Sequence, residues 1–450
     1  MENKSEKKKG PGVLDLYATF KLKDFIIFAL LSIINVAVPT TFSCMAPFFN
    51  DVARSKGLNL SEVGIVFGIF NFGSTCGAIV FGKFISLFGC KKIFLFGLFF
   101  SSLATTGFAF TNLIQSKNVY LASTVILRIL QAFGQSAVIT CCYTLSAKLF
   151  PQAISTIMAL FETSSAIGFS IGPLLGGFLY EVGGYQLPFI VISITLFCIA
   201  VVSIFFITDL PAEEKVVGDQ LIGNNIEGGY QKLLSSKDVI MLLIIVGIMG
   251  FCFNSIDPIL PVILQTEFNL TYTQIGTMFS GLAIGYALCA PFYGYIIDNY
   301  HNTNFMYVLG GTLVACCFYL MGVQFVTLFA LTPLLYAFIL FIFGCAACAL
   351  YVPAFKSLLD TVKAEGFSDS ISTTSAVSGA FSGAFNFGGF IGPIMSSTIA
   401  DFVGFKWTMT SIAGGVFLYT IIFAFFYVLP KRKYKSREKI GPALEAKINV

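Results

Sequence analysis

Twelve long apolar stretches set the limits on what this chain can fold into. An α-helix needs about 20 apolar residues to cross the hydrocarbon core of a bilayer. The stretches lie near residues 25–49, 62–88, 91–113, 119–149, 152–180, 187–208, 239–265, 272–299, 303–326, 329–361, 368–402 and 406–430. Only 11% of the residues are charged, whereas soluble domains carry about 25%. We therefore predict an all-α protein that crosses a lipid bilayer twelve times.

A hydrophilic segment between the sixth and seventh stretches divides the sequence into two halves. We expect an N-terminal tail at 1–24, a six-helix half at 25–208, a linker at 209–238, a second six-helix half at 239–430 and a C-terminal tail at 431–450. The linker combines glycine and asparagine with charges of both signs, which is typical of flexible connections.

Twelve crossings place both termini on the same side of the membrane, and the basic residues indicate which side. The opposite side carries only Arg54, Lys56, Lys117 and Lys406, whereas most other Lys and Arg residues fall on the side of the termini. Cytosolic loops are enriched in Lys and Arg. We therefore expect both termini and the linker in the cytosol. No sorting motif in the tails decides which membrane holds the protein.

The two halves share an internal sequence repeat. The motif GFSIGP at residues 168–173 recurs as GGFIGP at 388–393, 220 positions later, and Glu181 and Asp401 follow the two motifs at matching positions. Repeated halves are typical of transporters that open a central site to each side in turn. We predict two pseudo-symmetric six-helix halves with a binding cavity between them.

A second correspondence lies earlier in each half. Asn59-Leu60-Ser61 matches Asn269-Leu270-Thr271, and both triplets lie on the expected non-cytosolic side. They fit the pattern for N-glycosylation. Because each lies directly against the next apolar span, we favour the alternative that Ser61 and Thr271 cap helix N-termini.

Glu162 is the ionisable residue that stands out most, because it lies about ten residues into the fifth apolar run. A charged group at bilayer depth costs roughly 2.5–3.5 kcal/mol and normally faces a bundle interior or a water-filled cavity. We favour a functional role over the alternative that Glu162 only accepts hydrogen bonds from neighbouring hydroxyl groups.

The same span carries a glycine stripe at Gly168, Gly172 and Gly176, with a bend expected at Pro173. Small residues at every fourth position let another helix approach closely. We expect this seam to be needed for movement between states, with Gly392 and Pro393 as counterparts in the second half.

Two further ionisable groups are candidates for proton coupling. Asp257 precedes Pro258 in the seventh span, where it either serves function or caps a helix broken by proline. Arg128 in the fourth span either takes part in coupling or holds neighbouring helices together. Five uncharged polar side chains at bilayer depth are weaker candidates, since each is more often a helix–helix hydrogen bond than a ligand contact: Asn71, Gln131, Tyr286, Tyr351 and Asn386.

Several function classes are disfavoured. The sequence contains no recognisable nucleophile–base pair, nucleotide-binding loop or metal cluster, and its single histidine, His301, is in a short predicted cytosolic loop. Cys345 and Cys348 form a CxxC pattern, which we interpret as small residues packing in a membrane helix. The net charge of +4 does not by itself indicate nucleic acid. We expect neither an enzyme nor a cofactor.

The chain resembles the major facilitator superfamily, whose fold has six helices in each half. GxxxGPxxGG at 168–177 is similar to the fifth-helix signature of proton-coupled antiporters in that family, and 128–137 is similar to the fourth-helix signature RxxQGxGxA. Residues 82–92 resemble a loop signature but lack its acid. The second half keeps the acid as Asp298, so the resemblance implies a cytosolic latch there.

Within that superfamily the chain is most similar to the vesicular amine transporters, and among them to the vesicular polyamine transporter branch. The similarity is carried by FLYEVGGYQLPF at 178–189, by Asp257-Pro258 and by GFSDSIS at 366–372. The chain departs from monoamine and acetylcholine transporters, because Asn35, Cys348 and Ser382 occupy positions where those proteins carry acids.

The resemblance implies a monomeric secondary transporter that exchanges protons for a small organic cation, a polyamine or related amine, in an intracellular vesicle membrane. Helices one, four, seven and ten are expected to line the cavity, with Asn35 among the substrate contacts. We expect Glu162 to bind the proton and the cation in turn, since a carboxyl in a low-dielectric site favours its protonated form and a nearby cation favours the ionised form. Asp257 is then the second cation contact. The alternatives are a plasma-membrane exporter of drugs or metabolites and a non-transporting membrane sensor.

Overall fold

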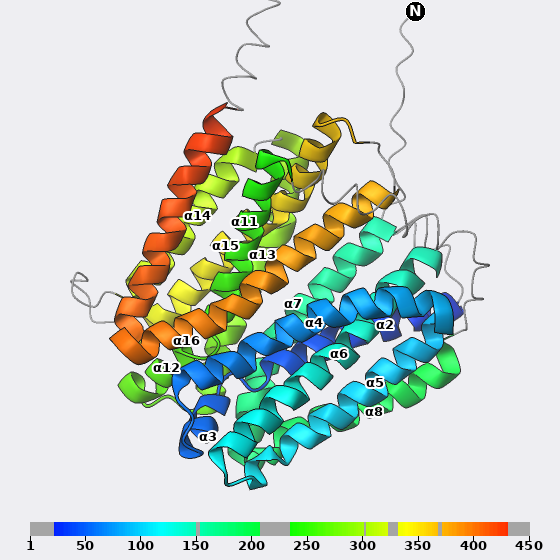
Figure 1. Cartoon of the computed structure of the whole chain (residues 1–450), viewed down its shortest axis with the longest axis vertical. Coiled ribbons are helices and arrows are strands. Elements are labelled where there is room, and N and C mark those ends of the chain that lie inside the picture. Colours follow the sequence, from blue (N-terminus) through cyan, green and yellow to red (C-terminus); the bar gives the residue numbers. More distant parts are fainter. Residues whose placement is uncertain are drawn as a thin grey trace, which may run out of the picture. The chain divides into compact units, whose positions relative to one another are not determined.

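The computed structural model describes residues 22–149, 154–207, 235–300, 303–322, 332–367 and 371–430 as helices and short connections (Figure 1). Eleven helices in these ranges are long and apolar enough to cross a membrane. The last of them, α16 (Ile371–Phe423), is two helices joined at Gly404, whose φ of 81° turns the chain between the predicted eleventh and twelfth spans. The prediction of an all-α membrane fold is confirmed. Most of the predicted tails and linker lie outside the described residues.

The chain forms two compact units. The first consists of Met1–Asn59, Ile69–Val216 and Asn269–Ser280. It contains α2 (Leu22–Ser43), α3 (Phe49–Ser55), α5 (Cys90–Ala109), η1 (Thr111–Leu113), α6 (Lys117–Leu149), α7 (Ile154–Gly183), α8 (Gln186–Phe206), most of α4 (Leu60–Phe88) and the first turns of α13 (Tyr272–Tyr300). Within this unit α2 packs along α7, and α5 packs against both α6 and α8 (Figure 1).

The second unit consists of Leu60–Gly68, Val217–Phe268 and Gly281–Val450. It contains α11 (Lys237–Ser255), α12 (Leu260–Phe268), α14 (Thr303–Gly322), α15 (Pro333–Ala364), α16, the π-helical turn η2 (Ala424–Val428), the first turns of α4 and the rest of α13. Here α11 and α14 both pack against α16 and against α15. The pairing of α11 with α16 repeats the pairing of α2 with α7.

Two spans differ from their predicted extents. The first, predicted at 25–49, ends at Ser43 and is followed by the separate short helix α3. The seventh, predicted as one stretch at 239–265, is divided into α11 and α12, and the chain is not helical from 256 to 259. The break has a local cause, because Pro258 and Pro261 lack the amide hydrogens that would continue the ladder of α11.

Close glycine packing recurs in both units. A Cβ atom at Gly168 would overlap the carbonyl oxygen of Val36 in α2, and one at Gly176 would overlap that of Cys44. In the second unit a Cβ at Gly388 would overlap the carbonyl oxygen of Gly247 in α11, and one at Gly392 would lie 2.5 Å from that of Phe251. Only glycine allows these backbones to approach so closely, so the repeated motif corresponds to a repeated helix contact.

The predicted helix caps are confirmed at one site and wrong at the other. The Thr271 hydroxyl accepts a hydrogen bond from the Gln274 amide at 3.4 Å, and the Gln274 side-chain oxygen accepts one from the Thr271 amide at 3.0 Å. This reciprocal pair is a capping box at the start of α13. Ser61, by contrast, lies inside α4, and its hydroxyl donates to Asp401 rather than accepting from its own helix.

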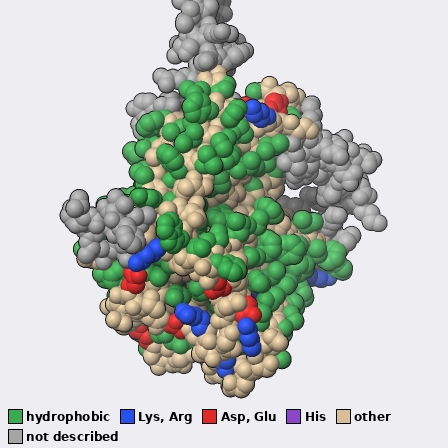
Figure 2. Space-filling model, turned by 60° about the vertical axis from the view of Figure 1, so that its left-hand side comes forward, with side chains coloured by type: hydrophobic (Ala, Val, Ile, Leu, Met, Phe, Trp, Pro, Cys, Tyr) green, Lys and Arg blue, Asp and Glu red, His purple; other side chains and the backbone are tan. Residues whose placement is uncertain are grey.

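The outer faces of the helices are largely apolar. Large hydrophobic side chains such as Leu103, Phe205 and Trp407 are exposed, and hydrophobic side chains cover much of the surface visible in Figure 2. In a membrane protein such side chains contact lipid, so their exposure is expected.

Candidate functional site

Glu162 lies in the third turn of α7, about 12 Å along the helix from its first described residue. The preceding residue, Phe161, is fully buried and stacks on Phe28 of α2, with 6.2 Å between ring centroids. The Glu162 side chain is instead exposed. The register of α7 therefore turns Phe161 into the first unit and the carboxylate out of its packed interior.

The polar contact of Glu162 comes from the neighbouring helix. The Tyr143 hydroxyl of α6 donates to Oε1 of Glu162 over 3.5 Å. Nearby hydroxyl groups are already used within their own helices: Thr144 donates to the Thr140 carbonyl and Ser164 to the Leu160 carbonyl, both at 2.9 Å. Glu162 thus accepts a hydrogen bond from one neighbouring hydroxyl group, but its side chain is exposed rather than enclosed in a packed interface.

Arg128 is buried, with 1% of its surface exposed. Its guanidinium donates to the side-chain oxygen of Gln131 at 2.7 Å and to the backbone carbonyl of Phe42 at 3.2 Å. It also lies 5.2–5.7 Å from the ring centroids of Phe42, Phe70 and Phe108, within reach of cation–π attraction. One side chain thus contacts α2, α4, α5 and α6, which supports the helix-holding alternative for Arg128.

Gln131 completes this buried group. Its side-chain nitrogen donates to the Thr105 hydroxyl of α5 at 2.9 Å, so both ends of its amide are engaged inside the first unit. One turn further along α6, Gln135 is also buried, and neither its oxygen nor its nitrogen has a hydrogen-bond partner among the described residues. An unsatisfied buried amide is costly, and a water molecule or a polar ligand would relieve that cost.

Asp257 belongs to the second unit and lies in the non-helical break between α11 and α12. Its side chain is half-buried. The predicted proline-broken helix is therefore present, and it holds the carboxylate beyond the C-terminal end of α11.

The other predicted polar residues lie in varied surroundings. Asn35 is buried in α2, where its side-chain nitrogen donates to the Leu31 carbonyl at 2.9 Å and its side-chain oxygen has no partner among the described residues. Asn71 of α4 is buried, and Asn386 of α16 is half-buried.

Two predicted tyrosines lie in aromatic clusters of the second unit. The Tyr286 ring is 5.9 Å from that of Phe253, and the Tyr351 ring is 4.7 Å from that of Phe381 and 5.3 Å from that of Phe385. Asp298 is a residue of α13 whose side chain lies outside the described part of the structure. The aromatic surroundings of the two tyrosines are compatible with either packing or ligand contact.

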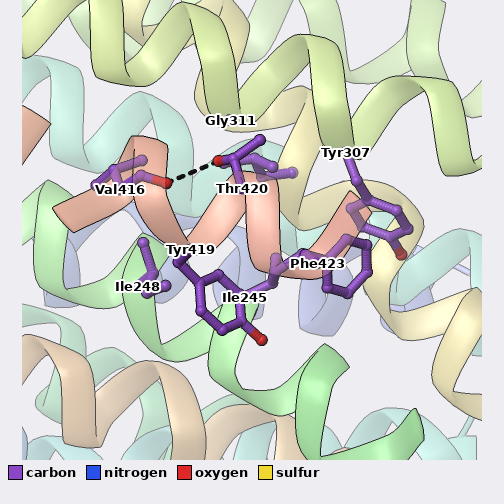
Figure 3. Close-up of a pocket in the computed structure, with 9 residues that line it drawn as sticks. Ile245, Ile248, Tyr307, Gly311, Val416, Tyr419, Thr420 and Phe423 are labelled. Atoms are coloured by element: carbon purple, nitrogen blue, oxygen red, sulfur yellow. Dashed lines mark hydrogen bonds between the residues drawn. The ribbon is translucent and has the colours of Figure 1, made fainter. Parts of the chain in front are cut away.

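A small pocket in the second unit is lined by Ile245, Ile248, Tyr307, Gly311, Leu350, Val416, Tyr419, Thr420 and Phe423 (Figure 3). Its lining is mostly apolar and includes none of the predicted site residues. The Thr420 hydroxyl is already bonded to the Val416 carbonyl at 2.8 Å. Nothing in the lining would neutralise an organic cation.

Sequence reasoning missed Tyr143 and Gln135. Each is one of several polar side chains in a long apolar span, and neither lies in a repeated motif. Gln135 occupies an unspecified position of the signature-like stretch at 128–137, and Tyr143 lies beyond that stretch. Neither observation identifies which face of the helix meets α7.

Comparison with known proteins gives consistent results. Residues 31–366 and 242–448 match the sequence profile of the Major Facilitator Superfamily. The MFS-type transporter SLC18B1 of Rattus norvegicus is 30% identical over 439 residues, which cover 96% of this chain and 94% of that protein. The protein of the same name from Homo sapiens is 27% identical over 416 residues, covering 92% and 88% of the two chains.

Solved structures with the same fold are also transporters. A bacterial homologue of the human lysosomal transporter Spinster has a TM-score of 0.70 at 11% identity, covering 93% of this chain and 98% of that one. The nucleoside transporter NupG has a TM-score of 0.68 at 13% identity, covering 89% and 99% of the two chains.

Proposed function

Because this chain belongs to the Major Facilitator Superfamily and is a multi-pass membrane transporter rather than an enzyme, we propose that it exchanges protons for a small organic cation of the polyamine or related amine class. The observation that carries the proposal is the exposed carboxylate of Glu162 within a membrane-spanning helix. A carboxylate facing lipid would cost roughly 2.5–3.5 kcal/mol. It is therefore expected to face water that substrate and protons can reach.

One carboxylate can serve both ligands. A cationic substrate stabilises the ionised form of Glu162, and a proton from the acidic side displaces the cation by neutralising the same group. An empty, ionised carrier would have to move an uncompensated charge through a low-dielectric environment, so it reorients slowly and leaks little. Asp257 supplies a second negative charge, which suits a substrate with more than one ammonium group.

The proposed location is an intracellular vesicle membrane, with both termini in the cytosol and the protein acting as a monomer. The distribution of Lys and Arg supports this orientation. A fluorescent fusion should co-localise with an acidic-compartment dye. Fluorescence confined to the plasma membrane would favour the alternative of an exporter, a function named in the multi-drug resistance efflux pump PmrA of Streptococcus pneumoniae, which is 23% identical over 382 residues.

The decisive experiment uses the full chain in proteoliposomes that are acidic inside. Labelled spermidine should accumulate, a protonophore should abolish the accumulation, and a monoamine or acetylcholine should be taken up poorly. Glu162→Gln imitates the protonated state, so this variant should lose gradient-driven uptake and cation affinity while keeping its fold, measured as a monodisperse peak in detergent.

Glu267→Gln is the matched control, since Glu267 is also on a described helix but forms an exposed 3.8 Å ion pair with Lys406. It should transport normally. If Glu162→Gln still concentrates spermidine in response to the pH gradient, the assignment to Glu162 is wrong and Asp257 becomes the coupling residue to test.

A further inference from the structure

We propose that Tyr143 and Glu162 together form the subsite for an ammonium group in the first unit. This inference rests on the proposed function and adds a residue that no sequence motif indicated. The 3.5 Å between the Tyr143 hydroxyl and Oε1 of Glu162 is long, because hydroxyl–carboxylate bonds are normally about 2.5–2.7 Å. The carboxylate therefore keeps most of its capacity to bind a cation.

The Tyr143 side chain offers two features that an ammonium group can use. The residue is 37% exposed, so a cation at the carboxylate can also contact the aromatic ring. Its hydroxyl can accept a hydrogen bond from an ammonium N–H or donate one to the carboxylate. Neighbouring Thr140 and Thr144 donate to carbonyl groups of α6, which leaves Tyr143 as the side chain of this segment that contacts Glu162.

Two variants of Tyr143 separate the contributions of its ring and its hydroxyl group. Binding of labelled spermidine to the purified full chain should weaken about threefold to tenfold in Tyr143→Phe, which keeps the ring, and by more than about tenfold in Tyr143→Leu, which loses both features. Tyr319→Leu is the matched control, because Tyr319 is a tyrosine of α14 with a similar exposure of 42%, and it should bind normally.

The outcomes distinguish this inference from the proposed function. Loss of binding in Glu162→Gln together with normal binding in Tyr143→Leu overturns the role of Tyr143 and leaves the function intact. Normal binding in Glu162→Gln overturns the assignment of the cation site to Glu162, whereas absence of spermidine binding by the unmodified chain overturns the proposed function itself. A graded loss from Phe to Leu supports the subsite, whereas equal losses in both variants would indicate a structural role and contradict it.

A second inference rests on a different pair of acids, Glu181 and Asp401, which occupy matching positions in the repeat. Glu181 lies in the last turn of α7, and its two oxygens accept hydrogen bonds from the Thr273 amide and the Thr273 hydroxyl, both at 2.8 Å. Asp401 accepts from the amides of Leu60 at 3.2 Å and Ser61 at 2.7 Å, and from the Ser61 hydroxyl at 2.5 Å.

Each acid therefore binds the N-terminus of a helix that is remote in sequence. Glu181 contacts the start of α13 across 92 positions, and Asp401 contacts the start of α4 across 340 positions. The first amides of a helix have no partner in their own helix and carry partial positive charge, so a carboxylate there is stabilising. The helices are in close contact near each acid. A Cβ atom at Gly276 of α13 would overlap the carbonyl oxygen of Pro173 in α7, and a Cβ atom at Gly64 of α4 would overlap the carbonyl oxygen of Pro393 in α16.

We infer that Glu181 and Asp401 are a symmetric pair of latches on the non-cytosolic side. In a carrier whose two sequence halves open to each side in turn, a contact between a helix of one half and a helix of the other can exist only while its own side is closed. Opening that side separates the start of α13 from α7 and the start of α4 from α16, and returns both N-termini to water. The inference does not depend on which substrate is carried.

Buried serines near the latches can report their opening. Ser280 of α13 donates to the Ser170 carbonyl of α7 at 2.5 Å. The Ser397 side chain of α16 is 2.7 Å from the position that a Cβ atom at Gly64 of α4 would occupy. Cysteine would replace each serine in a background where the exposed Cys198 and Cys316 are alanine. A membrane-impermeant maleimide would then label the reporters from the non-cytosolic side.

Glu181→Gln should raise labelling of the Ser280→Cys reporter by about tenfold, and Asp401→Asn should do the same for Ser397→Cys, since each loses charge-assisted hydrogen bonds. Glu267→Gln should leave both reporters unchanged. Labelling that stays at the starting level in Glu181→Gln and Asp401→Asn would overturn the latch.

Discussion

At the scale of single residues, the structure gives two charged groups different surroundings, although the sequence shows both only as charges within apolar spans. Arg128 is enclosed by three phenylalanine rings and bonded to Gln131 and a backbone carbonyl. Glu162 is exposed and has one long hydrogen bond to Tyr143. A charge enclosed by aromatic rings and bonded to acceptors on two helices suits a structural role, whereas an exposed charge suits a ligand.

The Arg128→Lys substitution should therefore lower the free energy of unfolding more than it impairs proton-driven uptake. A lysine ammonium cannot reproduce the planar fork that meets two acceptors and lies against the rings, so we expect a loss of about 1–3 kcal/mol. Thermal unfolding of the detergent-solubilised chain would measure it. Arg54→Lys in α3, at an exposed position, should change stability by less than about 0.5 kcal/mol. Normal stability combined with lost proton-driven uptake would assign Arg128 to coupling instead.

At the scale of helices, the repeated glycine motif makes the same contact twice. The Gly168–Gly176 stripe of α7 meets α2, and Gly388 and Gly392 of α16 meet α11. In both cases the glycines are followed by an acid that binds a distant helix N-terminus. The seam and the latch are thus parts of one repeated element.

Gly172→Leu should abolish transport while the protein still reaches its membrane. Even a Cβ at this position would overlap the Ser43 hydroxyl and lie 3.1 Å from the Thr40 carbonyl oxygen, so a leucine would prevent α2 and α7 from sliding. The readout is spermidine uptake normalised to surface or vesicle abundance. Gly415→Leu is the control, because a Cβ at Gly415 meets nothing within 4 Å. Normal turnover in Gly172→Leu would show that the seam is not needed for movement.

At the scale of the whole molecule, the proposed exchange predicts a coupled proton flux. Adding spermidine outside acid-loaded proteoliposomes should raise the internal pH, because each cation that enters displaces protons from the shared carboxylate. A pH-sensitive dye trapped inside would record the change. The Glu162→Gln protein should give no signal above that of empty liposomes. A wild-type protein that binds spermidine without any change of internal pH would instead be a sensor.

Part of this protein could be read directly from its sequence. The apolar spans, the two-fold repeat, the break before Pro258 and the Thr271 cap depend on residues close together in the chain, and hydrophobicity, proline and capping chemistry act locally. The register of one helix against another is not local. Only the tertiary structure brings Tyr143 beside Glu162, encloses Arg128 in aromatic rings and places Glu181 and Asp401 on distant helix ends. The rotation of each helix about its axis depends on all its neighbours at once, and in a lipid-facing bundle apolar residues on every side leave no hydrophobic period from which to read it.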